Sequence, residues 1–315
     1  MPEVIFFIYK TEAKTSKIAN GVLRKASKYF SLAGINSCVM DIKNWNESIN
    51  CKISIGLGGD KPTSKRGKIT GDIIRHQAKQ SNKHIVIDRG YIYKRNEYWS
   101  VGWDGLNGRA DFRNKNSDIS RIKEWGIKLS PWSKNNDGHV LFCLQLPWDA
   151  AVSNTDYAKY TEDTINTILK STDRDVIIRE HPLINKGRGS TLDVAKRYKD
   201  SINKILKLKR VYKSDKKTIE EDFKNTWCVV SYNSNSTVEA TIHGIPSFVK
   251  DRGSMTWGIS SHGLDIENPL RPERDQWFYD ISYSQWSEQE ISSGVPFRRL
   301  GVKEYLLDVT FFKGE

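Results

Sequence analysis

The chain has 315 residues, of which 37% are hydrophobic and 28% charged, a composition typical of a folded protein with about two domains. No apolar run approaches the roughly 18 residues that a membrane span requires, so the sequence predicts no span. The net charge of +12 and the pI of about 9.3 favour an anionic partner such as a nucleic acid, a nucleotide or a phosphorylated lipid.

The cysteines and the N-terminal residues bear on the compartment. Cys38, Cys51, Cys143 and Cys228 are scattered and show no CxxC spacing, which argues against a disulfide framework or a zinc site. The first ten residues, MPEVIFFIYK, lack the basic region and the cleavage site of a secretion signal. We therefore expect a cytoplasmic protein, in the host cytoplasm if a phage encodes it.

The N-terminal half alternates between short apolar runs and helical periodicity. Strand-length apolar runs occupy 3–10, 35–41, 51–59 and 84–90, and helical spacing covers 14–32 and 70–80. This alternation predicts a parallel sheet with crossover helices. Residues 91–132 are aromatic, Gly-rich and basic, and they predict loops with one short strand before a linker. The first domain is expected to span residues 1–135.

Positive charge is concentrated in one region of this domain. Residues 61–128 contain 16 Lys and Arg against 7 Asp and Glu, so nine of the twelve net charges lie there. A solvated basic surface is the simple interpretation, and an anion-binding surface is the functional one.

The second half repeats the alternation with greater regularity. Apolar strands are expected at 139–146, 175–182, 209–214, 227–234 and 245–251, with helices at 156–170, 192–206, 218–225 and 236–244. The pattern predicts a second doubly wound domain over residues 136–275. Residues 276–315 follow the sheet series and are expected to form a helical segment that packs across both domains.

The segment SYNSNSTVEATIHGIP, residues 231–246, places small hydroxyl and amide side chains between a strand and a helix. Free N–H groups at a helix start bind anions, and Ser234, Ser236 and Thr237 add hydroxyl donors for a diphosphate. Glu239, one turn further, is positioned to accept from a ribose or sugar hydroxyl. The alternative is that these residues only cap the helix.

Two further strand ends in this domain carry polar residues. Arg179 and His181 follow the apolar run of IIREHP, where ligands bind in open α/β sheets. Arg binds phosphate in a bidentate manner, and His can donate to a departing phosphate. LQLPWDA places Gln145, Trp148 and Asp149 at the same edge. The alternatives are a surface ion pair for Arg179, and a packed Trp with a helix cap for the second motif.

A resemblance to a known family rests on these motifs. Their order, 145–149, 179–182 and 234–246, resembles the C-terminal donor domain of GT-B glycosyltransferases, especially the capsule-polysaccharide type. YSQWSEQEISSG, residues 283–294, is similar to an end segment common in phage and bacterial proteins of that group. The resemblance implies an α/β fold of two Rossmann-like domains with a cleft between them. It also implies a nucleotide diphosphate sugar as donor, UDP-linked in our interpretation, with neither a metal nor another cofactor.

The N-terminal domain is then expected to supply the acceptor site and the general base. An inverting transfer needs a carboxylate that takes the proton from the attacking hydroxyl. Asp88, at the end of an apolar strand, has such a position, and Asp60 in GLGGDKP is its competitor. The pair of motifs resembles the acceptor domain of phage DNA β-glucosyltransferase, from which the chain departs in having Asp60 between the glycines and Lys61. Alternatively, Asp88 caps a turn and pairs with Arg89.

Basic and aromatic residues are interleaved in the domain expected to bind the acceptor, a mixture that neutralises phosphates and stacks exposed bases. The residues assigned to acceptor binding are Lys61, Arg66, Arg89, Tyr91, Trp99, Trp103 and Arg109. We therefore expect the sugar to pass to the hydroxyl of a flipped 5-hydroxymethylpyrimidine in double-stranded DNA. Two alternatives remain: the acceptor is a capsule or lipopolysaccharide chain and these aromatic residues form a core, or the protein is an inactive DNA-binding module with the same fold.

Overall fold

The computed structural model describes residues 1–10, 14–186 and 191–307 and divides the chain into two compact units. Unit 1 comprises residues 1–121 together with the chain from Tyr279 onward, and unit 2 comprises Ile122–Phe278. The first boundary lies before the expected 135/136 because the backbone N–H groups of Ser130 and Ser133 donate to the carbonyls of Ile242 and Gly244 in unit 2. No described helix is long and apolar enough to cross a membrane.

Unit 1 contains a six-stranded sheet in the order β11-β5-β4-β3-β1-β2. Four strands are parallel neighbours, and β5 and β11 are antiparallel to theirs. The elements of residues 1–125 are β1 (Val4–Ile8), α1 (Lys14–Leu32), β2 (Ser37–Asp41), η1 (Ile42–Asn44), β3 (Ile53–Leu57), α2 (Lys65–Lys79), β4 (Lys83–Arg89), β5 (Tyr98–Trp103), η2 (Asn107–Arg109) and α3 (Ser120–Trp125), the last of which ends in unit 2.

The last part of the chain belongs to the core of unit 1. It forms α8 (Asp275–Ser282), which begins in unit 2, then β11 (Gln285–Ser287), α9 (Glu288–Ser292), α10 (Val295–Arg299) and α11 (Val302–Leu307). The ring of Phe30 on α1 packs edge-on between Phe6 of β1 and Phe297 of α10, with centroids 5.1 and 4.9 Å away. The expected C-terminal segment is therefore an integral part of unit 1 from Tyr279, and its residues 308–315 lie outside the described residues.

Unit 2 contains a five-stranded, wholly parallel sheet in the order β10-β9-β6-β7-β8. Its elements are β6 (His139–Cys143), η3 (Ala150–Val152), α4 (Tyr157–Ser171), β7 (Val176–Arg179), η4 (Ile184–Lys186), α5 (Leu192–Ile205), β8 (Val211–Lys213), α6 (Ile219–Phe223), β9 (Thr226–Ser231), α7 (Ser236–Ile242), β10 (Ser247–Val249) and η6 (Trp257–Ile259).

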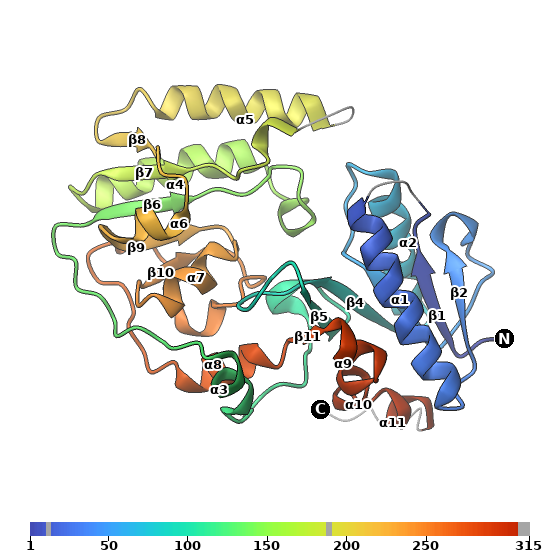
Figure 1. The fold of residues 1–315 in the computed structure, drawn as a ribbon. Helices are drawn as coiled ribbons and strands as arrows, with labels where there is room; N and C mark the ends of the chain where they lie inside the picture. Colours follow the sequence, from blue (N-terminus) through green and yellow to red (C-terminus); the bar gives the residue numbers. More distant parts are fainter. Residues whose placement is uncertain (11–13, 187–190, 308–315) are drawn as a thin grey trace. The chain divides into compact units, whose positions relative to one another are not determined.

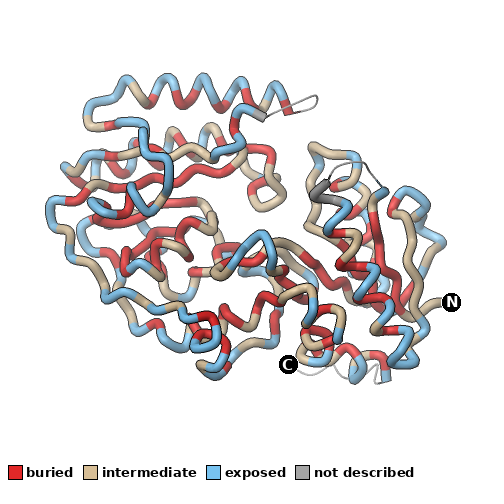
Figure 2. Tube along the Cα trace, in the orientation of Figure 1, coloured by how far each residue is buried: buried red, intermediate tan, exposed pale blue. Residues whose placement is uncertain are grey.

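Alternating side chains of the central strands of unit 2 build a core on each face of the sheet. Val140 and Phe142 point to the face covered by α4 and α5, whereas Leu141 and Cys143 point to the face of α6 and α7. Figure 1 shows these two helix pairs on opposite sides of the strands. Figure 2 shows that the strands and the inward faces of the helices are buried. Both units are thus doubly wound and Rossmann-like, as the sequence predicted.

Candidate functional site

Three strand-end loops of unit 2 meet in one buried hydrogen-bond network. The side chain of Gln145, after β6, donates to Asn233 Oδ1 at 2.8 Å and accepts from the Asn233 backbone N–H at 3.1 Å. Asn233, after β9, donates to the carbonyl of Ala151 at 3.0 Å and to the carboxylate of Asp251, after β10, at 2.9 Å. The parallel strands bring these loops to one edge of the sheet, where the sequence predicted a ligand site.

The other two residues of the first motif support this loop. Trp148 is buried in the core on the α4 side. Asp149 caps η3 by accepting from the Ala151 N–H at 3.0 Å. The hydroxyl of Tyr157 accepts from the Gln145 N–H at 2.8 Å, and burial raises the pKa of Tyr157 well above its ordinary value. Gln145 is therefore the residue of this motif that the hydrogen bonds to Asn233 place in the network.

Arg179 ends β7, and its guanidinium is directed toward the loop after β8. It forms an ion pair with the buried Asp222 of α6 and donates to the carbonyls of Lys216 and Lys217, both at 3.3 Å. The Ser214 hydroxyl donates to both Asp222 oxygens, at 2.8 and 2.9 Å. Arg179 therefore does form an ion pair, but the pair is largely buried and is not the surface ion pair of the alternative.

His181 lies two residues beyond Arg179 in the loop after β7. Its Nδ1 accepts from the Leu183 backbone N–H at 3.1 Å. Because Nδ1 uses its lone pair as an acceptor, the proton of the neutral ring is on Nε2.

The turn between β9 and α7 uses most of its hydroxyl groups internally. Ser234 Oγ accepts from the Ser236 N–H at 3.2 Å, and the fully buried Thr237 donates to the Ser234 carbonyl at 2.8 Å. Ser236 is also buried. Glu239 accepts from the Asn235 side chain at 3.3 Å. Ser234 and Thr237 thus stabilise the turn, in line with the capping alternative, whereas the buried Ser236 hydroxyl takes no part in these bonds. Ser234 and Glu239 are partly exposed.

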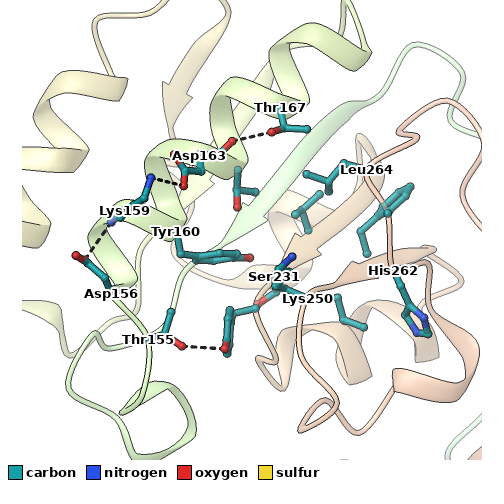
Figure 3. A pocket seen from close by; sticks show the side chains of 16 residues that line it. Thr155, Asp156, Lys159, Tyr160, Asp163, Thr167, Ser231, Lys250, His262 and Leu264 are labelled. Carbon is teal, nitrogen blue, oxygen red and sulfur yellow. Dashed lines mark hydrogen bonds and ion pairs between the residues drawn. The ribbon is translucent and has the colours of Figure 1, made fainter.

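A cavity of about 590 Å³ in unit 2 borders two of these strand ends (Figure 3). It runs along α4 and is closed on the other side by β9, β10 and residues 262–264. Ser231 and Tyr232 at the end of β9 and Lys250 after β10 are among its lining residues. Its volume lies within the range of small-molecule sites, about 300–1,000 Å³.

The two candidate bases lie in unit 1. Asp88, near the end of β4, is half-buried and accepts from the Arg89 N–H at 2.8 Å. Burial, together with the nearby carboxylate of Asp88, raises the pKa of Tyr91. Asp60 forms an ion pair with Arg75 of α2 and packs where Gly71 has no Cβ, since a Cβ there would lie 2.4 Å from Asp60 Cγ. Asp60 is thus held against α2.

The four basic residues assigned to acceptor binding differ in their environments. Lys61 and Arg66 flank the start of α2, are partly exposed, and form no ion pair with another described residue. Arg89 donates to the Asn96 carbonyl at 2.9 Å and lies over the Trp99 ring, 4.7 Å from its centroid. Arg109, at the end of η2, is exposed.

The aromatic residues assigned to base stacking serve another purpose. Trp99 and Trp103 belong to the main core of unit 1, and Trp103 Nε1 donates to the Leu300 carbonyl at 3.0 Å. Tyr91 is buried as well. None of the three presents a ring face to a base, because each is needed to fill the unit's interior. The alternative that these aromatic residues form a core is the correct one.

Comparison with known proteins gives a fold but no family. No protein-family model matches the chain, and no curated protein sequence matches it. Among solved structures, KpsC of Thermosulfurimonas dismutans, a beta Kdo 2,7 transferase, is similar with a TM-score of 0.52 and 10% identity, over 96% of this chain and 99% of that one. The UDP-GlcNAc 2-epimerase of Methanocaldococcus jannaschii aligns over 97% of this chain and 100% of that one with 11% identity. Its TM-score of 0.35 is too low to support an inference about this protein. The chain thus shares its fold with this transferase, and its two Rossmann-like α/β units confirm the fold class expected from the sequence.

Several residues of this region were not identified from the sequence. Asn233 joins all three loops, and its position within SYNSNS was the available signal. Asp251 and Lys250 directly follow the last strand, a position that the strand-end rule should have included. Asp222, the partner of Arg179, lies on a helix with no local signal. Within the described ranges, no cluster of His, Cys, Asp and Glu is suited to hold a metal.

Proposed function

We propose that this protein is a glycosyltransferase whose donor, a nucleotide sugar, binds at the strand-end loops of unit 2. The observation that carries the proposal is the network of Gln145, Asn233 and Asp251, which ties three such loops together in a unit with a transferase-type fold. A buried hydrogen-bond network of this kind gives a rigid frame on which binding groups can be held. Rigid placement of those groups is what a transfer reaction requires.

The donor phosphates are assigned to the loop after β7 and the turn before α7. The Nε2–H of His181 donates to the phosphate that departs with the nucleotide, which stabilises its developing negative charge. Arg179 contributes positive charge at the same strand end, although Asp222 shares its guanidinium. Ser234 and Glu239 are partly exposed polar residues of this segment, and they are assigned to a phosphate and to a ribose or sugar hydroxyl.

The general base is assigned to Asp88 in unit 1. Its competitor Asp60 is engaged in an ion pair with Arg75 and is held against α2. Asp88 would take the proton of the acceptor hydroxyl as that oxygen attacks the sugar. The Asp88→Asn variant is expected to bind the donor normally and to lose turnover by about 100-fold or more. Loss of turnover in Asp60→Asn instead would move the base to Asp60.

The acceptor is proposed to be a saccharide hydroxyl of a capsule or lipopolysaccharide chain. The named activity of KpsC, transfer of Kdo, makes nucleotide-activated Kdo the first donor to try, followed by UDP-sugars. The test is incubation of the protein with a panel of nucleotide sugars and oligosaccharides, with products identified by mass spectrometry. A product formed by the unaltered protein and absent with His181→Ala supports the proposal. Failure of every donor to bind contradicts it.

DNA bearing hydroxymethylated pyrimidines is the second candidate acceptor. One observation favours it: the cations Lys61, Lys65 and Arg66 near the start of α2 form no ion pair with another described residue. Phosphate contacts predict DNA affinity that falls steeply as salt rises. Including modified and plain duplexes in the same panel, followed by nucleoside mass analysis, separates this acceptor from a saccharide. DNA binding without donor binding would instead indicate an inactive DNA-binding module.

A further inference from the structure

The cavity beside α4 lies where a doubly wound sheet is usually covered by a helix. After β10 the chain forms η6 and returns as residues 261–267, and Ser261 makes a bridge to Phe248. Between this return segment and α4, the sheet face of β9 and β10 lines the cavity with Val230 and Phe248. The cavity therefore exists because the chain after β10 does not return as a helix over this face of the sheet.

The walls combine aromatic rings with hydroxyl groups. Tyr160 of α4 meets Tyr232 edge-on with ring centroids 5.0 Å apart, and Thr155 donates to the Tyr232 hydroxyl at 2.8 Å. Figure 3 shows Tyr160 projecting from α4 toward the strands and Leu264 on the opposite wall. Flat apolar surface edged by hydroxyl groups fits a planar ring joined to a polar sugar.

The two lysines that line the cavity, Lys159 and Lys250, differ in their ion pairs. Lys159 forms an ion pair with Asp163 at 2.8 Å, and Asp156 forms one with Arg197 at 2.8 Å. Lys250 lines the cavity at the end of β10 and forms no ion pair with another described residue. Its ammonium group can therefore meet a ligand anion at the strand-end side of the cavity.

The cavity adjoins the polar network of the proposed donor site through two loops. Tyr232 lines the cavity, and the next residue, Asn233, is the centre of the network. Lys250 lines the cavity, and the next residue, Asp251, accepts from Asn233. The loops after β9 and β10 thus each contribute one residue to the cavity and the next residue to the network.

We propose that this cavity binds the nucleoside of the donor, with the base between Tyr160 and Leu264 and the first phosphate at Lys250. The inference rests on the proposed function, because it adds a nucleoside site to the donor site proposed for unit 2. The cavity holds the base, the ribose and, at Lys250, the first phosphate, and the other strand-end loops hold the rest of the donor. None of the four wall residues Tyr160, Tyr232, Lys250 and Leu264 was assigned to the donor from the sequence.

Two exposed glycines provide a matched pair of variants. Gly263 lines the cavity and Gly258 does not, while a Cβ at either position meets no atom within 4 Å and neither has a left-handed φ. Gly263→Trp should fill the cavity and weaken binding of UMP, CMP and UDP by about tenfold or more in calorimetric titrations. Gly258→Trp should bind them like the unaltered protein. Equal nucleotide affinity in both variants would overturn the cavity assignment and leave the proposed function standing.

A lysine variant tests the position of the phosphate. Lys250→Ala should weaken binding of UMP and CMP by about tenfold and leave binding of uridine and cytidine unchanged, because only the monophosphates carry the anion. Lys209→Ala, which removes an exposed lysine away from the cavity, is the control. Equal loss for nucleosides and monophosphates would contradict the placement of the phosphate. Absence of all nucleotide binding to the unaltered protein would overturn both the cavity assignment and the proposed function.

Discussion

Arg179 and Asp222 form an ion pair that links the end of β7 to α6 inside unit 2, with only 3% of the Asp222 side chain exposed. The aspartate also accepts from Ser214, so both of its oxygens are engaged. The pair holds Arg179 at the sheet edge where the donor phosphates are proposed to bind. If the donor phosphates bind there, stability and donor binding are coupled through one guanidinium.

Removing the aspartate alone should be strongly destabilising. Asp222→Ala leaves Arg179 largely buried without its counter-charge, and we expect the free energy of unfolding to fall by about 3–5 kcal/mol in urea denaturation. The double variant Arg179→Met, Asp222→Leu removes both charges and should recover much of that loss. A loss under about 1 kcal/mol for Asp222→Ala would mean that the pair behaves like an exposed one.

Position 244 requires glycine for two reasons, its backbone conformation and the lack of space for a Cβ. Its φ is +78°, and a Cβ at this position would lie 2.0 Å from the Pro131 carbonyl oxygen. Gly244→Ala should lower the free energy of unfolding by more than about 2 kcal/mol, because strain and overlap act together. The control is Gly258→Ala, where a Cβ meets no atom within 4 Å and the change should stay within about 1 kcal/mol. Similar melting temperatures for the two variants would refute this explanation.

The sequence predicted most of the fold because the signals for it are local. The expected helices at 14–32 and 192–206 correspond to α1 and α5 almost residue for residue, and the strands of unit 2 lie within the expected apolar runs except for Thr226 at the start of β9. Periodicity reports which side chains face a core, and that is decided within a few residues. β11 was missed because three residues carry too little pattern, and their pairing partner β5 lies far away in the sequence.

The candidate site was predicted less completely, since it depends on contacts between distant residues. The strand-end rule located Gln145, Arg179 and Ser234 at one edge of the sheet. It could not reveal that Thr237 faces inward or that Asp222 engages Arg179, because neither fact leaves a local trace. Trp99 and Trp103 were misassigned for a related reason: their surroundings are Gly-rich and basic, but β5 is covered by residues from the C-terminal segment.

His84 should make the stability of unit 1 dependent on pH. It is fully buried beside Ser54, and burial lowers its pKa from 6.5 to about 4. Because the folded pKa is below the unfolded one, protonation favours unfolding. The free energy of unfolding should be constant above pH 6.5, fall by up to about 3 kcal/mol between pH 6.5 and 4, and lose no more to this group below that.

The His84→Gln variant isolates this contribution. Burial also lowers the pKa of His139, so the unaltered protein contains a second group that acts in the same direction. The difference in unfolding free energy between the two proteins, measured by urea denaturation from pH 4 to 8, removes the part due to His139. A difference that does not change with pH would contradict the assignment to His84.

Gln285 fastens the C-terminal segment to the loop that follows Asp88. Its side-chain oxygen accepts from the N–H groups of Tyr91 and Ile92 at 2.6 and 2.9 Å, and its amide donates to the Tyr93 carbonyl at 3.0 Å. Gln285 is fully buried. Replacing it by Ala leaves three backbone groups without their partner, so Gln285→Ala should lower the free energy of unfolding by about 3 kcal/mol or more.

Hydrogen exchange measures directly whether the Gln285 side chain holds the loop at residues 91–93. In Gln285→Ala, the amides of Tyr91 and Ile92 should exchange faster than in the unaltered protein, because both lose their acceptor. Gln289→Ala, at an exposed position of α9, is the control and should change neither exchange nor stability by a measurable amount. If Asp88 is the base, turnover should fall in Gln285→Ala while donor affinity in unit 2 stays the same. Unchanged exchange at 91 and 92 would show that this loop is held in place by other contacts.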